Sequence, residues 1–129
     1  MPPLPITSTL TVLATLGLVA LSLPITAHRF RAKVPLGDGR DPLLQARIRA
    51  HANFAEYVPL ALIVTGLAEA AAAPPWLLWT SSGMLVVGRI GHAIGMFGRP
   101  PSLPRVVGML LTWGGLALAA AALALTLVR

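Results

Sequence analysis

The sequence predicts an all-α protein, an integral membrane bundle of four helices. The chain of 129 residues is 56% hydrophobic and only 11% charged, and its mean hydropathy of +0.78 is too high for a soluble domain of this length. The apolar residues gather in four segments, separated by three breaks rich in proline, glycine or charge. We therefore expect one membrane domain, residues 1–129, with spans near residues 6–27, 43–73, 76–97 and 105–128.

The first segment, residues 6–27, is apolar apart from threonines and serines, whose hydroxyls can bond to the preceding helical turn. No Lys or Arg precedes it. The positively charged start of a signal peptide is therefore missing, and we expect a retained span. The segment ends at the basic run His28-Arg29-Phe30-Arg31-Ala32-Lys33.

The second segment follows a connection made of turn residues. Residues 34–42 contain two glycines and two prolines, together with Asp38 and Asp41, and such a stretch cannot continue a helix. Asp41 followed by Pro42 predicts a helix start, with Asp as the cap and Pro at the first position. We expect the polar first turns of this helix at the membrane interface, and residues 58–67 as its apolar part.

The third and fourth segments are separated from their neighbours by prolines. Pro74 and Pro75 make a tight, uncharged break, and Trp76 and Trp79 beside it are typical of an interfacial aromatic belt. The third segment carries three glycines on one helical face, which favours close packing of helices. The fourth segment, rich in Ala and Leu, begins at Arg105.

The positive charge is confined mainly to two connections. Ten Lys and Arg against four Asp and Glu give a formal net charge of +6. Six of these ten basic residues lie in two connections, Arg29, Arg31, Lys33 and Arg40 in the first and Arg99 and Arg105 in the third. Because basic loops favour the inner side of a membrane, we expect both connections in the cytoplasm and both termini outside. Nucleic-acid binding is not expected, since aromatic residues are sparse and no recognised motif is present.

The chain has no cysteine. It can therefore form neither a disulfide nor a thiolate nucleophile of its own, and any thiol chemistry must arrive with a ligand. Its three histidines are scattered without the spacing of metal ligands, so no metal site is predicted.

A polar face interrupts the hydrophobic second segment. At about 100° per residue, Arg49, Asn53 and Glu56 fall at about 0°, 40° and 340°, with Tyr57 near 80°. Ionisable groups inside a membrane are costly unless they pair or face a polar cavity, so they indicate a site. A guanidinium, an amide, a carboxylate and a phenol on one face suit a zwitterionic ligand with carboxylates and an ammonium group. The alternative is a structural ion pair between Arg49 and Glu56 that holds helices together.

Four further polar residues have both a structural and a functional interpretation. Arg47 lies on roughly the opposite side of the second helix, where it is expected to meet a neighbouring loop, another subunit or lipid headgroups. Arg89 needs a partner, and Glu56 is the carboxylate expected nearest in depth. His92 is a candidate site residue or a satisfied interhelical histidine. Arg105 is a positive anchor at the interface, or a cation that lowers the pKa of a bound thiol.

The run RAHANFAEYVP at residues 49–59 resembles the signature of the membrane-associated proteins in eicosanoid and glutathione metabolism, the MAPEG family. Residues 36–42 and 88–93 resemble its bacterial branch, and the resemblance extends from about Arg29 to Arg105. It implies four spans per subunit, a homotrimer in a bacterial inner membrane, and glutathione bound between neighbouring subunits near the cytoplasmic end of the bundle.

The resemblance also assigns roles to single residues. The side chains that it places around glutathione are Arg49, Asn53, Glu56, Tyr57, Arg29 and His92. Arg105 follows His92 at the spacing of the arginine that lies near the thiol in the family's eicosanoid enzymes, and it is the predicted catalytic residue. One departure is Met96, which replaces a tyrosine of the better-known members, so that a phenol able to contact glutathione is lost.

Three hypotheses for function follow. The first is a membrane glutathione transferase, with peroxidase activity as an extension, in which Arg105 activates the thiol for attack on a lipophilic electrophile that arrives from the bilayer. The second is a non-catalytic scaffold that binds glutathione or another anion. The third is a small proton-coupled exporter of lipophilic cations that uses Glu56, although the neighbouring arginines would repel a cation.

Overall fold

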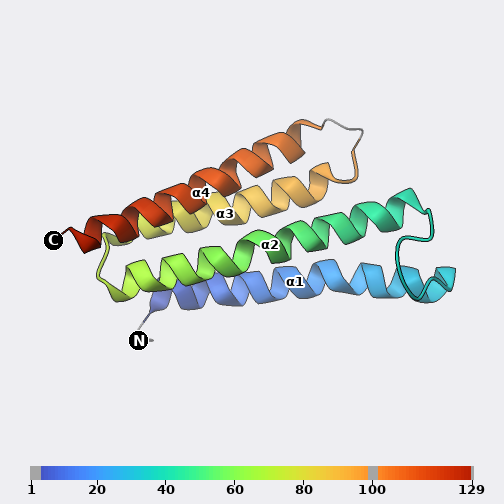
Figure 1. The fold of residues 1–129 in the computed structure, drawn as a ribbon, viewed down its shortest axis with the longest axis horizontal. Helices are drawn as coiled ribbons and strands as arrows, with labels where there is room; N and C mark the ends of the chain where they lie inside the picture. The colour runs from blue at the N-terminus through green and yellow to red at the C-terminus, as the bar shows by residue number, and fades with distance from the viewer. Residues whose placement is uncertain (1–3, 99–101, 129) are drawn as a thin grey trace.

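The computed structural model describes residues 4–98 and 102–128, which form four α-helices (Figure 1). The helices are α1 (Pro5–Ala32), α2 (Pro42–Ala70), α3 (Pro75–Gly95) and α4 (Leu103–Leu127). No strand occurs in these two ranges, so the predicted all-α fold is confirmed. Arg99, one of the predicted loop cations, lies outside the described residues.

The helices pair into two antiparallel hairpins, α1 with α2 and α3 with α4 (Figure 1). The connection 34–41 and the connection from α3 to α4 lie at one end of the bundle, which we call the loop end. Both chain termini and the connection from α2 to α3 lie at the opposite end. Helix α2 packs against all three other helices, whereas α1 contacts α2 and α3 but not α4. The helix that carries the predicted polar face is therefore central to the bundle.

Helix α1 is longer than predicted and ends at Ala32 instead of Ala27. Arg29 and Arg31 lie in its last turn, where cations interact favourably with the exposed carbonyl groups of a helix end. Lys33 then closes the helix in a left-handed conformation with φ of 54°. The basic run up to Arg31 thus belongs to the helix, and only its last residue, Lys33, ends it.

Helix α2 begins as the Asp41-Pro42 pattern predicts. The Oδ1 atom of Asp41 accepts hydrogen bonds from the backbone N–H groups of Leu43, at 2.8 Å, and Leu44, at 3.0 Å. The other carboxylate oxygen lies 2.8 Å from Nε2 of His28 at the end of α1. These partners, the Leu44 N–H most of all, hold the pKa of the Asp41 carboxyl below its usual value.

The opposite end of α2 holds the start of α1 through Glu69. Its carboxylate accepts hydrogen bonds from the backbone N–H groups of Ile6 and Thr7, each at 2.8 Å, and from the Thr7 hydroxyl at 2.7 Å. These N–H groups have no partner inside the helix, and the negative charge suits a helix N-terminus. The sequence had suggested no role for Glu69. Beyond it, α2 ends at Ala70 and not at residue 73, and Ala72 has a positive φ of 56°.

Helices α3 and α4 pack at backbone distance because of their glycines. A Cβ atom on Gly88 would lie 2.8 Å from the carbonyl oxygen of Gly108. A Cβ on Gly95 would overlap the backbone of Arg105, so the start of α4 lies directly against the last turn of α3. The packing role predicted for the glycines of the third segment is confirmed.

Two of the described helices, α1 and α4, are long and apolar enough to cross a membrane, each with a mean hydropathy of 2.0 in its most apolar window. Helices α2 and α3 do not meet this criterion, since they carry the polar residues of the candidate site. With 29 and 21 residues, they are about 43 and 31 Å long, enough for a hydrocarbon core of about 30 Å. That they span the membrane stays a prediction.

Candidate functional site

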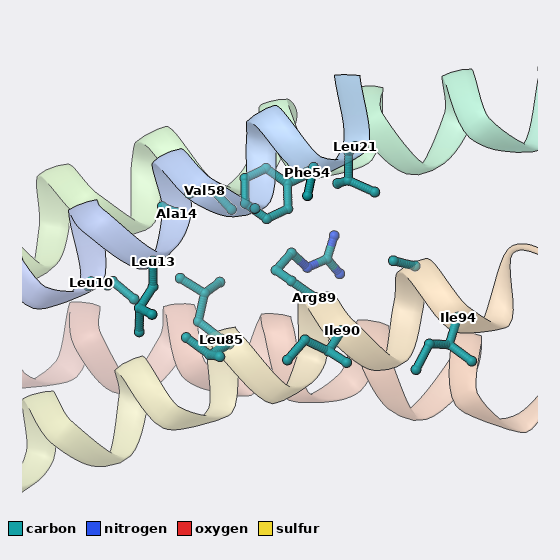
Figure 2. Close-up of a pocket in the computed structure, with 14 residues that line it drawn as sticks. Leu10, Leu13, Ala14, Leu21, Phe54, Val58, Leu85, Arg89, Ile90 and Ile94 are labelled. Carbon is teal, nitrogen blue, oxygen red and sulfur yellow. The ribbon is translucent and has the colours of Figure 1, made fainter. Parts of the chain in front are cut away.

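Arg89 of α3 is the centre of a buried polar network. Figure 2 shows its side chain pointing from α3 towards α2 and α1, and only 5% of the residue is exposed. Its Nε donates to the Thr112 hydroxyl at 2.9 Å. One terminal nitrogen donates to the side-chain oxygen of Asn53, and the other lies 3.5 Å from the sulfur of Met109. The guanidinium therefore joins α2, α3 and α4 through neutral acceptors.

The predicted pairing of Arg89 with Glu56 is wrong. The Glu56 side chain is exposed on the surface of the chain, and the ion pair found among the described residues joins His28 and Asp41. The physical reason is the rotation of α2, which turns Glu56 about 60° from Asn53. Similar depth in the bundle therefore does not bring Glu56 of α2 to Arg89 of α3.

Tyr57 lies against the same guanidinium. The central carbon of the Arg89 guanidinium is 5.5 Å from the centroid of the Tyr57 ring, which is a cation–π geometry. The Tyr57 hydroxyl oxygen accepts a hydrogen bond from Nε1 of Trp113 on α4 at 3.3 Å. Two residues of the predicted face, Asn53 and Tyr57, are thus joined by Arg89. Trp113 was not predicted, because nothing in the sequence relates it to a tyrosine on another helix.

Arg49 and Arg105 share a cavity at the loop end. This cavity has a volume of about 600 Å³ and is lined by the starts of α2 and α4 and by Met96 and Phe97 after α3. Both arginines are exposed, and no carboxylate belongs to the described lining residues. Two cations that face one cavity without a countercharge favour an anionic ligand.

His92 and Arg29 occupy different surroundings. His92 is 4% exposed, and the glycine at position 108 lets the α4 backbone pack directly against the His92 backbone. Both interpretations of the His92 side chain stay predictions. Arg29 donates to the carbonyl oxygen of Pro35 at 3.1 Å. It lines a separate cavity of about 430 Å³ together with Lys33. Within one chain, Arg29 does not line the cavity of Arg49 and Arg105.

Arg47 contacts the end of helix α1 in its own chain, where a neighbouring loop, another subunit or lipid headgroups had been expected as its partner. It donates to Nδ1 of His28 at 3.0 Å and to the carbonyl oxygen of Pro24 at 3.4 Å. A guanidinium only donates, so Nδ1 of His28 accepts and its Nε2–H donates to Asp41. Arg47 therefore stabilises the junction of α1 and α2 and lies outside the candidate site.

An apolar cavity of about 350 Å³ lies between α1, α2 and α3 (Figure 2). Its lining extends from Leu10 and Leu13 to Ala93 and Ile94, and Arg89 is the charged residue in its wall. The lining of the loop-end cavity begins again at Met96. The linings of the apolar cavity and of the basic cavity thus come next to each other at the end of α3.

The four helices and the polar residues of α2 are those of a helical membrane protein, and the chain belongs to the MAPEG family, whose family model matches residues 7–125. It is 34% identical to the inner membrane protein YecN of Escherichia coli K12 over 107 residues, which cover 83% of this chain and 81% of that protein. The protein of the same name from Escherichia coli O6:H1 matches with the same identity and coverage. The predicted family is confirmed, and the inner-membrane location of the relatives agrees with the predicted membrane location.

Proposed function

We propose that the protein is a membrane glutathione transferase that activates the glutathione thiol for attack on a lipophilic electrophile. The observation that carries this proposal is the cavity shared by Arg49 and Arg105 at the loop end. Glutathione brings carboxylates for cationic partners and an ammonium group for a carboxylate. Asn53, one turn beyond Arg49 on α2, and Glu56, two turns beyond it, extend the same face.

In this proposal Arg105 stabilises the thiolate. The chain has no cysteine, so the reacting sulfur belongs to the ligand. A fixed positive charge beside a thiol favours its deprotonated form. The backbone of Arg105 is held against α3 at Gly95, which fixes the point from which its side chain extends along the cavity.

We also infer that the site is completed by a second copy of the chain, in a homotrimer. Arg49 and Glu56 are exposed on the single chain, and a carboxylate within a membrane is costly where it faces lipid. A neighbouring subunit would cover this face. It would also bring an Arg29, which in its own chain lies in a different cavity. Binding between subunits accounts for both observations.

The apolar cavity supports a lipophilic second substrate. Its volume of about 350 Å³ is within the range of small-molecule sites. Its lining residues come from helices that we place in the bilayer, with the basic loops on the cytoplasmic side. A lipophilic electrophile would enter this cavity from the bilayer and reach the bound thiol at the end of α3, where the linings of the two cavities come next to each other at Ile94 and Met96.

Calorimetric titration of glutathione into the detergent-purified protein tests the proposal. We expect Arg49→Ala and Glu56→Ala each to weaken binding by at least about tenfold, the loss typical of a hydrogen bond to a charged group. Arg47→Ala is the matched control, because this arginine of the same helix contacts His28 and not the cavity. Absence of binding to the folded wild type would contradict the proposal and favour a non-catalytic scaffold.

A further inference from the structure

The hydrogen bonds of Asn53 determine which of its atoms remain for a ligand. The guanidinium of Arg89 carries only donors and stays charged. The Asn53 atom that faces it must therefore be the side-chain oxygen, as the structure has it. The amide nitrogen, with its two N–H groups, is the atom left to interact with other partners.

The same reasoning applies to Tyr57. The indole N–H of Trp113 is a donor that cannot accept, so the Tyr57 oxygen is the acceptor of this hydrogen bond. The phenol keeps its own O–H hydrogen. Among the side-chain hydrogen bonds of residues 4–98 and 102–128, the Tyr57 hydroxyl takes part in this one alone, which leaves that hydrogen free to donate.

We propose that Arg89 and Trp113 are positioning residues that hold Asn53 and Tyr57 as hydrogen-bond donors towards one acceptor group of the ligand. Under the function proposed above, on which this inference rests, that group is a carboxylate of glutathione. Asn53 and Tyr57 are i, i+4 neighbours on α2 and lie on one side of the helix. The buried charge of Arg89, which meets only neutral acceptors, adds a positive potential behind them.

This arrangement favours a ligand group that accepts hydrogen bonds over one that donates them. An ammonium or amide N–H placed against Asn53 and Tyr57 would leave donors facing donors, and unpaired polar groups are costly where water is excluded. A carboxylate accepts from both side chains at once. The ammonium group of the ligand is then left for Glu56, which the network of Arg89 does not include.

The variant Trp113→Phe separates this role from a structural one. It removes the indole N–H and keeps an aromatic ring at a position that is 52% exposed, so folding is expected to be retained. Trp79→Phe is the matched control, since Trp79 is 51% exposed and contributes to none of the side-chain hydrogen bonds found in the described ranges. Arg89 is unsuitable as the first target, because its loss would leave a polar gap between three helices.

The first measurement needs no ligand. Tyr57 is the only tyrosine of the chain, so ultraviolet resonance Raman spectroscopy reports the hydrogen bonding of this one phenol. We expect the ligand-free protein to show a phenol oxygen that accepts a hydrogen bond, a signal that Trp113→Phe removes and Trp79→Phe retains. Tyr57 phenol bands that do not change in Trp113→Phe would overturn the inference, whether or not the protein binds glutathione.

The second measurement compares glutathione with two analogues, in each of which one carboxylate is replaced by a carboxamide. We expect the wild type to prefer glutathione to at least one analogue, and Trp113→Phe to reduce that preference about fivefold, as for the loss of one neutral hydrogen bond. Equal weakening of all three ligands, with the ratio unchanged, would overturn the positioning role. If the folded wild type binds none of these ligands, the proposed function fails. The Tyr57 spectrum is then the one test of the hydrogen bond from Trp113 to Tyr57.

Discussion

Arg105 is the residue on which the proposed chemistry depends most directly. Arg105→Ala is expected to raise the pKa of the bound thiol by about one unit or more, because an opposite charge a few ångströms away shifts a pKa by that amount. The thiolate absorbance of the complex at neutral pH should fall by about tenfold, while glutathione affinity remains measurable. The readout is ultraviolet difference spectroscopy of the protein saturated with glutathione.

Arg105→Lys is the control for this prediction, since it retains the positive charge and loses only the planar guanidinium. The lysine variant should keep most of the thiolate signal. Equal thiolate absorbance in the wild type and in Arg105→Ala would exclude Arg105 as the activating charge and leave it as an anchor at the membrane interface.

At the scale of single residues, the sequence was informative about which residues lie near one another on a helix. It was less informative about the side chains that they contact on other helices. The period of the helix correctly placed Asn53 and Tyr57 near one another, and the structure joins them through Arg89. It did not reveal the partner of Arg89, because depth along a bundle says nothing about the rotation of each helix. The hydrogen bond from Trp113 to Tyr57 depends on how α4 packs against α2, which no local pattern encodes.

At the scale of the helices, the start of α2 makes the stability of the folded state depend on pH. The folded state lowers the pKa of Asp41 below its usual value of 3.8. The carboxylate therefore stabilises the fold above that value, and this contribution is lost as the pH falls through the lower, folded value. Asp41→Asn should make the unfolding temperature less sensitive to acid in the range from about pH 5 to pH 2.

Thermal unfolding followed by circular dichroism across that range measures the effect. Asp38→Asn is the matched control, because this loop carboxylate receives a hydrogen bond from the Arg40 backbone N–H and caps no helix. The interpretation is contradicted if both variants follow the wild type at every pH.

The contact of α3 with α4 yields a second prediction at this scale. In Gly88→Ala the new Cβ would lie 2.8 Å from the Gly108 carbonyl oxygen and 2.8 Å from the Thr112 hydroxyl. Such overpacking costs about 1–3 kcal/mol, so the unfolding temperature in detergent should drop by several degrees. The Thr112 hydroxyl also accepts from Arg89, so glutathione binding should weaken with it.

Gly83→Ala in the same helix is the control for Gly88→Ala. No atom lies within 4 Å of the Cβ it would add, and alanine is the better helix former by about 0.8–1.0 kcal/mol. This variant should be slightly more stable than the wild type. If the two alanine variants had the same unfolding temperature, the close contact of the helices would not limit stability.

The existence of the four helices was predictable and their ends were less so. Long apolar runs between prolines and glycines define helices by composition alone. The end of α1 was misplaced because a basic run was interpreted as a loop, although cations are favourable in a last helical turn. The cap that Glu69 provides to α1 joins positions far apart in the sequence, beyond the range of any pattern of neighbouring residues.

At the scale of the whole molecule, the proposed trimer requires that each glutathione site receive its Arg29 and its Arg49 from defined subunits. Arg49 and Arg29 line separate cavities of one chain, yet the resemblance to the MAPEG family places both around glutathione. A trimer with its sites between subunits satisfies both statements. It predicts that Arg29→Ala and Arg49→Ala each weaken glutathione binding when every subunit carries the change.

Mixed trimers of these two variants distinguish the possibilities. If each site takes Arg49 from one subunit and Arg29 from the next, then random mixing in equal amounts restores both arginines at about a quarter of the sites, as follows from cyclic symmetry. Calorimetry should then recover glutathione binding at wild-type affinity with a stoichiometry near that fraction, and native mass spectrometry should confirm that the trimers are mixed. If mixed trimers form and no binding returns, the two arginines do not act across a subunit interface, and glutathione must be held within a single chain.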